Sequence, residues 1–163
     1  MNYIEIKPLD IANGEGIRVS LFVSGCPHHC NGCFNPQSWD WNYGEYFGND
    51  TITEIIELMN HDYIKGLSLL GGEPFAQGDK LLKLLSKVKL IYPHKDIWAY
   101  SGYTFEELLK MKHEMLPWVD VLVDGRFVLE EKNPSLKFRG STNQRIIDVQ
   151  KSFGLGEVVL YME

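Results

Sequence analysis

Residues 17–33 read IRVSLFVSGCPHHCNGC, a stretch that joins two different patterns. Its first seven residues, Ile17 to Val23, form a short β-branched and apolar run, which predicts a buried strand. The residues that follow hold every cysteine of the chain, spaced C-x3-C-x2-C at Cys26, Cys30 and Cys33. Three thiols cannot all be paired in disulfides, so the loop predicts a metal or redox site directly after a strand.

Strand-like and helix-like segments alternate on the carboxyl side of this loop. Further apolar runs predict strands, and amphipathic runs with a 3.6-residue period predict the helices between them. The predicted strands are 66–70, 96–100 and 119–124, and the predicted helices are 51–60, 79–92 and 104–115. Helix caps are predicted at Thr51 with Glu54, at Asp79, and at Thr104 with Glu107. The alternation predicts an α/β fold whose parallel strands are joined by right-handed crossovers.

A glycine-bearing loop follows each predicted strand. The loops read SGCPHHCNGC, GGEP, SGYT and DGRF, and they begin at Ser24, Gly71, Ser101 and Asp124. In parallel α/β folds the loops at the carboxyl ends of the strands share one face and build the site. We therefore expect the four loops to meet. Glycine after a strand is also ordinary turn chemistry, and for SGYT and DGRF taken alone this structural explanation is the better one.

Composition and charge narrow the class of protein. The chain has 163 residues, 44% of them hydrophobic and 23% charged, which is typical of one ordinary globular domain spanning residues 1–163. Its net charge of -6 gives no global attraction to nucleic acid or to an anionic membrane, so neither is expected as a partner. A basic leader and an apolar stretch of about 18 residues are both lacking, so a cytoplasmic location is expected. In a reducing compartment, clustered cysteines indicate metal or redox chemistry.

Three kinds of site compete for the cysteine loop. A zinc ion could bind Cys26, Cys30, Cys33 and either His28 or His29, because Cys3His is a known structural ligand set. A disulfide between Cys30 and Cys33 would leave Cys26 unexplained. A [4Fe-4S] cluster would receive three thiolates and keep one iron without a protein ligand. Catalytic metal sites differ from closed structural sites because the protein leaves one coordination position without a ligand.

The cysteine loop after the first strand and GGEP after the second together resemble the motifs of the radical S-adenosylmethionine enzymes. The resemblance implies that Cys26, Cys30 and Cys33 hold a [4Fe-4S] cluster and are the catalytic centre. It implies that the open iron chelates the amino and carboxylate groups of S-adenosylmethionine, and that GGEP contacts the amino end of this cofactor, with Glu73 making a charge-assisted bond. The residues assigned to the cofactor are Phe34, Gly71, Gly72, Glu73, Pro74, Ser101 and Gly102.

Longer stretches are similar to the activating proteins of the anaerobic ribonucleoside-triphosphate reductase. They are residues 13–16, 21–39, 96–108, 119–127 and 139–152. The resemblance implies a partial, open (βα)6-type barrel with parallel strands. It also implies that S-adenosylmethionine is cleaved reductively and that a glycine on the large subunit of the reductase loses its α hydrogen to leave a glycyl radical. The electron would come from a one-electron donor such as flavodoxin.

Two positions depart from the pattern of these families. Gly32 stands where the wider superfamily has an aromatic residue, and Phe34 is expected to supply the ring near the adenine. Glu15 stands where the activating proteins often have proline, and Gly-Glu-Gly is similar to the 7-carboxy-7-deazaguanine synthases. A radical enzyme acting on a small molecule, a zinc-stabilised interaction module without catalysis and a small iron-sulfur electron carrier therefore stay open as alternatives.

Other residues near the four loops have two explanations each. Tyr103 either lines the cofactor side or belongs to a turn, and the same choice holds for Asp124 and Arg126. His28 and His29 are expected to be loop residues or partner contacts in preference to ligands. An aromatic group after the cysteine loop predicts either ordinary packing or a protein interface, and its members are Trp39, Trp41, Tyr43 and Tyr46.

Overall fold

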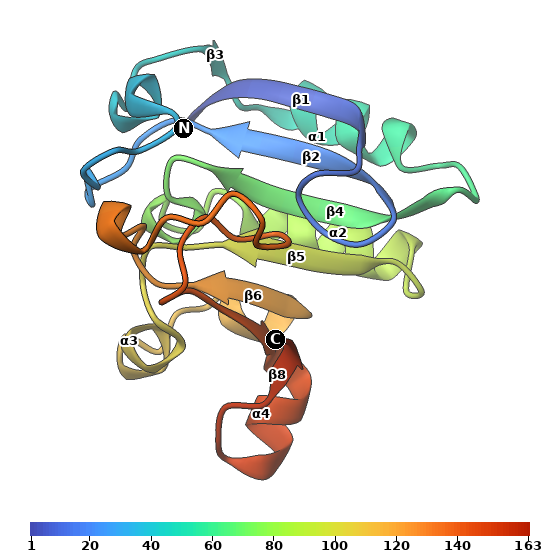
Figure 1. Ribbon diagram of the computed structural model, residues 1–163. Helices are drawn as coiled ribbons and strands as arrows, with labels where there is room; N and C mark the ends of the chain where they lie inside the picture. The colour runs from blue at the N-terminus through green and yellow to red at the C-terminus, as the bar shows by residue number, and fades with distance from the viewer.

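Four parallel strands form the centre of the sheet in the computed structural model, which describes residues 1–163 (Figure 1). They are β2 (Ile17–Val23), β4 (Ile64–Gly71), β5 (Asp96–Tyr100) and β6 (Val121–Asp124). Each of the pairs β2/β4, β4/β5 and β5/β6 runs parallel, and all four arrowheads point to the left in Figure 1. The four strands predicted from apolar runs are confirmed, and their carboxyl ends share one edge of the sheet.

Three helices connect these strands: α1 (Asn49–Leu58), α2 (Leu82–Ile91) and α3 (Phe105–Lys110). They confirm the predicted helices, although α3 is shorter than expected. No helix of the chain combines the length and the apolar content needed to span a bilayer. Four short 3-10 helices lie in the loops, at Pro36–Trp39 (η1), Pro74–Ala76 (η2), Leu116–Trp118 (η3) and Leu129–Glu131 (η4).

Only one of the three predicted helix caps is confirmed. Thr104 Oγ1 accepts a hydrogen bond from Glu107 N, and Glu107 Oε1 accepts one from Thr104 N, which is a complete capping box at α3. The cap predicted at Thr51 is wrong, because α1 begins at Asn49 and Thr51 Oγ1 accepts the N–H of Gly48. The cap predicted at Asp79 is also wrong, because α2 begins at Leu82 and no side chain caps it.

Antiparallel strands flank the parallel centre on both sides, so the sheet as a whole is mixed, which the sequence analysis did not predict. They are β1 (Asn2–Asp10), β3 (Glu45–Tyr46), β7 (Arg145–Asp148) and β8 (Leu160–Met162), with helix α4 (Val149–Leu155) between the last two. The loop 11–16 that joins β1 to β2 is too short for a parallel crossover. The order is β3-β1-β2-β4-β5-β6-β7-β8, an open sheet with three crossovers between parallel strands, where a sixfold repeat was predicted.

The two faces of the sheet are covered differently. A core cluster of 25 buried hydrophobic residues lies on the face that α1 and α2 cover, behind the sheet in Figure 1. Because successive side chains of a strand point to opposite faces, Leu67 and Leu69 of β4 join this core while Leu70 lies on the other side. Loops 11–16 and 125–144 pass in front of that second face. The space for a ligand therefore lies on the face without helices.

Candidate functional site

A cavity of about 680 Å³ lies on the helix-free face, beneath loop 125–144 and beside the carboxyl ends of the four parallel strands. All four predicted loops contribute to its wall, which confirms that they meet. Cavities of roughly 300–1,000 Å³ are those that bind small molecules in proteins. The wall includes Cys26, Cys30, Cys33, Phe34, Gly71, Gly72, Glu73, Ser101 and Gly102. Apart from Pro74, every residue assigned to the cluster or the cofactor from sequence thus faces one space.

The three cysteines are free and half-buried. Cys33 N donates to Cys30 O at 3.1 Å, and Asn35 N donates to Cys33 Sγ at 3.4 Å, so the second half of the loop forms a turn around its last sulfur. Burial raises the pKa of the Cys26 thiol, and the backbone N–H groups of His28 and His29 act against this rise. A metal ligand must be a thiolate, so a positive centre beside Cys26 has to compensate for the buried charge.

The donor set fits a cluster better than a zinc ion. His28 Nε2 lies 2.6 Å from Glu73 Oε1, and the His29 ring stacks on Trp39 with ring centroids 4.6 Å apart. The Nε2 atom of His28 is therefore used by Glu73, and the His29 ring is packed against Trp39. The thiols line one wall without gathering round a single ion position, and this suits a four-iron cluster, in which each cysteine binds a different iron.

The GGEP loop is fixed to the backbone at the start of the cysteine loop. Gly72 N donates to Val23 O at 2.8 Å, and Glu73 N donates to Gly25 O at 2.9 Å. Gly71 has a φ of 109°, and a Cβ built there would lie 2.6 Å from Val23 N. Glycine is required at this position for both reasons. Pro74 is buried at the first position of η2, where its ring favours the helical φ.

Gln77 strengthens the same junction and was not predicted. Its amide Nε2 donates to Ser24 O at 3.0 Å, to Gly25 O at 3.3 Å and to Glu73 O at 3.1 Å. The side chain is buried although it is polar, because its donors are all used. Its partners Ser24 and Gly25 precede it by about fifty residues, so only a prediction of the loop contact would have revealed its role.

Glu73 is the centre of a buried hydrogen-bond network. Besides His28, its carboxylate accepts from Gly102 N at 2.7 Å and from Phe75 N at 3.0 Å. Ser101 Oγ lies 3.0 and 2.9 Å from the two carboxylate oxygens. The residue is 1% exposed, and four donors match the acceptor capacity of a carboxylate. This geometry makes Glu73 a tie between loops, and its contact with the ammonium group of a cofactor stays a prediction.

The SGYT loop surrounds His28 and Glu73. The Tyr103 and His28 rings meet edge to face with centroids 4.5 Å apart, and burial raises the pKa of the Tyr103 hydroxyl. A Cβ at Gly102 would overlap the His28 imidazole, so glycine is required for this approach. Ser101 and Gly102 line the cavity as predicted, and their hydrogen bonds also hold Glu73 in place.

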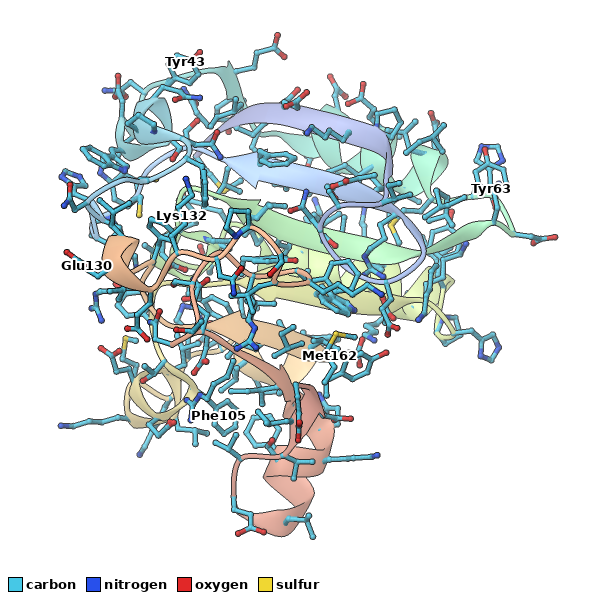
Figure 2. The ribbon with its side chains drawn as sticks, in the orientation of Figure 1. Tyr43, Tyr63, Phe105, Glu130, Lys132 and Met162 are labelled. Carbon is cyan, nitrogen blue, oxygen red and sulfur yellow. The ribbon has the colours of Figure 1, made fainter.

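Phe34 forms part of the cavity wall together with loop 125–144. Its ring packs against Phe127 with centroids 5.1 Å apart, and Lys132 Nζ lies 5.4 Å from the ring centre. A Cβ at Gly140 would lie 3.1 Å from Phe34 and 3.2 Å from Phe127, so the loop approaches both rings closely. Lys132 and Glu130 lie over the same end of the sheet as the cysteine loop (Figure 2).

For Asp124 and Arg126 the contacts favour the structural explanation. Asp124 is buried, accepts a hydrogen bond from Phe105 N at 2.8 Å and pairs with Arg145 at 2.5 Å. Arg126 reaches Glu107 at 3.4 Å on the surface. Neither side chain lines the cavity.

The aromatic group after the cysteine loop divides in two. Trp39 stacks on His29, and the Trp41 ring lies so close to Gly25 that a Cβ there would overlap it. Trp39 is therefore a packing residue of the loop, whereas Trp41 is 45% exposed although it contacts Gly25. Tyr43 and Tyr46 are exposed, and their use as a protein interface stays a prediction.

Glu15 lies away from the cavity. Its carboxylate accepts a hydrogen bond from the Tyr161 hydroxyl and lies 3.7 Å from Lys65 Nζ, at the amino ends of the parallel strands. The neighbouring Ala12 and Asn13 line the cavity, whereas Glu15 does not. The replacement of proline by Glu15 is therefore explained by a contact with the last strand.

Tyr100 is a further cavity residue that was not predicted. It ends β5, its hydroxyl is buried without a hydrogen-bond partner, and burial raises its pKa strongly. An unpartnered buried hydroxyl beside a cavity is suited to bind a polar ligand group. In the sequence, the one feature that could have indicated Tyr100 as a cavity residue is its position as the last residue of a predicted strand.

Comparison with known proteins agrees with this site. Residues 12–147 match the sequence model of the 4Fe-4S single cluster domain, so the fold and the site define a protein of that class. The chain is 45% identical over 150 residues to the anaerobic ribonucleoside-triphosphate reductase-activating protein of Haemophilus influenzae, covering 90% of this chain and 97% of the relative. The proteins of the same name from Enterobacteria phage T4 and Escherichia coli K12 are 44% and 43% identical, over 90% and 88% of this chain and 93% and 96% of theirs. The chain belongs to the family of anaerobic ribonucleoside-triphosphate reductase-activating proteins.

Proposed function

We propose that this chain cleaves S-adenosylmethionine reductively at a [4Fe-4S] cluster and thereby generates a glycyl radical on the anaerobic ribonucleoside-triphosphate reductase. The observation that carries the proposal is one cavity lined by three free thiols and the GGEP loop, with His28 Nε2 used by Glu73 and the His29 ring packed against Trp39. Three thiolates leave one iron open for a ligand. The names of the relatives supply the partner.

In this proposal the residues of the chain bind the cluster and orient S-adenosylmethionine beside it. Cys26, Cys30 and Cys33 would hold the cluster, and the GGEP backbone and Ser101 line the same cavity. Phe34 forms part of the cavity wall, where its ring packs against Phe127 of loop 125–144. The bound cluster and S-adenosylmethionine supply the one-electron chemistry: an external donor such as flavodoxin gives one electron, the partner glycine gives one hydrogen atom, and methionine and 5'-deoxyadenosine are released.

The open sheet supports a substrate delivered as a segment of another protein. Its four parallel strands and three crossovers are, in this proposal, the core of the partial radical S-adenosylmethionine barrel. The cavity is covered by loop 125–144, with loop 11–16 beside it, and no α-helix lies over it. The small-molecule alternative drew on Glu15, and the contacts of Glu15 with Tyr161 and Lys65 remove that support.

The cluster is tested by metal content. Anaerobically reconstituted protein is expected to be brown and to hold about four irons per chain. Replacement of Cys26, Cys30 or Cys33 by alanine, one at a time, should abolish the cluster, since two thiolates are too few to hold it. Iron and sulfide assays with an anaerobic absorption spectrum measure this, and a fully active protein that contains zinc alone would contradict the proposal.

The reaction is tested with an isotope in the partner. The protein, S-adenosylmethionine and a one-electron reductant should produce an electron paramagnetic resonance doublet on the anaerobic reductase. With glycine deuterated at its α carbon in the reductase, 5'-deoxyadenosine should contain deuterium and the doublet splitting should collapse. If a purine precursor supplies the hydrogen instead, the small-molecule function is the correct one.

A further inference from the structure

One side-chain hydrogen bond joins the first part of the cysteine loop to another segment of the protein. Between Cys26 and Gly32, the only backbone hydrogen bond is the turn closed by Cys30 O. The only hydrogen bond from these residues to another segment joins His28 Nε2 to Glu73 Oε1, at 2.6 Å. The two side chains are 4% and 1% exposed. The place of this part of the loop therefore depends on His28.

The surroundings of His28 form a built pocket. Tyr103 packs against the edge of the imidazole, and Gly102 leaves the room that a side chain would fill. Gly102 N and Ser101 Oγ hold the Glu73 carboxylate on its other sides. Glu73 in turn is fixed to Gly25 through its backbone N–H. The hydrogen bond of His28 thus ends on an acceptor that three separate loops keep in place.

We propose that His28 is a positioning residue of the cluster site: its hydrogen bond to Glu73 fixes the loop so that Cys26 and Cys30 face the cavity before the cluster is inserted. The role rests on the proposed cluster at the three cysteines. His28 is not a ligand in this proposal, because its Nε2 is used by Glu73. A buried hydrogen bond to a charged group contributes enough to order a short loop that has no other contact of this kind.

The test compares three variants of the full chain. His28→Leu removes the donor and keeps apolar bulk against Tyr103. His28→Gln keeps an amide donor. His29→Asn is the matched control, because it removes the neighbouring ring and asparagine tolerates the φ of 49° found there. Two quantities are measured: the rate at which an iron chelator removes iron from the reconstituted protein, and the rates at which iodoacetamide labels the three thiols of the iron-free protein.

We expect His28→Leu to lose iron about tenfold faster than the wild type, the scale of one hydrogen bond to a charged group. Labelling of Cys26 and Cys30 should change relative to Cys33. His28→Gln and His29→Asn should stay near the wild-type rates. Gly102→Ala keeps every donor but displaces the imidazole, so it should shift both measurements in the same direction as His28→Leu. This variant decides the question if His28→Leu does not fold.

The proposal is overturned if His28→Leu, folded by circular dichroism, keeps the wild-type iron release and labelling pattern. It is also overturned if His29→Asn changes both rates as much as His28→Leu, since the effect would then be a general loosening of the loop. A wild-type protein that takes up no iron contradicts the proposed function, while the labelling rates of the iron-free variants still decide the role of His28.

Discussion

At the scale of single residues, the Glu73 carboxylate joins several loops at the candidate site. The GGEP pattern indicated a cofactor contact through the carboxylate. The structure surrounds that carboxylate with donors from three other residues besides its own loop. A carboxylate that is 1% exposed and accepts from four donors holds together the loops it joins. Its replacement should therefore affect the protein even without a cofactor.

Glu73→Gln tests this in the iron-free protein. The new amide group would face backbone or side-chain donors, so a hydrogen bond is lost and a donor is left unpaired. We expect the free energy of unfolding to fall by about 1–3 kcal/mol, measured by urea denaturation. Glu130→Gln, on the exposed helix η4, is the control and should stay within about 0.5 kcal/mol of the wild type. Equal stability of Glu73→Gln and the wild type would mean that the carboxylate serves the cofactor alone.

At the scale of elements, the apolar runs in the sequence predicted the strands that are covered on both faces of the sheet. Strands β2, β4, β5 and β6 have such runs because parallel central strands are covered on both faces. Strand β1 is largely exposed and contains a proline, so no apolar run announces it, and β7 and β8 are too short to show a period. The cysteines and GGEP were found because their chemistry is local. The contacts of His28, Gln77 and Tyr100 were not predicted, because the residues around them come from segments distant in sequence.

The last strand is tied to loop 11–16 by the hydrogen bond from Tyr161 to Glu15, and this contact depends on pH. The hydrogen bond to Glu15, with burial second, raises the pKa of Tyr161 from 10.0 to about 12. The folded chain therefore holds this proton more tightly than the unfolded chain. The stabilisation is complete below pH 10 and is lost as the pH rises from 10 to about 12.

Tyr161→Phe should accordingly melt at a lower temperature than the wild type near neutral pH, and this difference should close as the pH approaches 12. Thermal unfolding of the iron-free protein, followed by circular dichroism, measures it. Tyr63→Phe is the control, because the Tyr63 hydroxyl makes no hydrogen bond and the residue lies at the far end of the sheet from the cysteine loop (Figure 2). A difference for Tyr161→Phe that stays constant between pH 8 and 12 would contradict the assignment.

At the scale of the whole molecule, the two faces of the sheet differ: one carries most of the hydrophobic core, and the other carries the candidate site. The helix-side face carries the large core, and the other face carries the cavity and its covering loop. Loop 125–144 has little regular structure, only the single turn of η4 and an isolated bridge between Lys132 and Ser141, and its Phe127 and Lys132 contact Phe34, directly after the last cysteine. Segments with few buried apolar contacts open at low free energy. A ligand bound in the cavity should therefore order this loop more than any other part of the chain.

Hydrogen exchange measured by mass spectrometry tests whether the ligand binds on the helix-free face alone. With S-adenosylmethionine added to the reconstituted protein, peptides covering residues 127–140 should exchange more slowly, because the loop closes the cavity around the ligand. Peptides from α1 and α2 should be unchanged, since these helices lie on the opposite face. The iron-free protein is the control: because the proposed function attaches S-adenosylmethionine to the open iron, loop 127–140 should show little protection without the cluster. Equal slowing on both faces would indicate a global gain of stability and would contradict a binding site confined to the helix-free face.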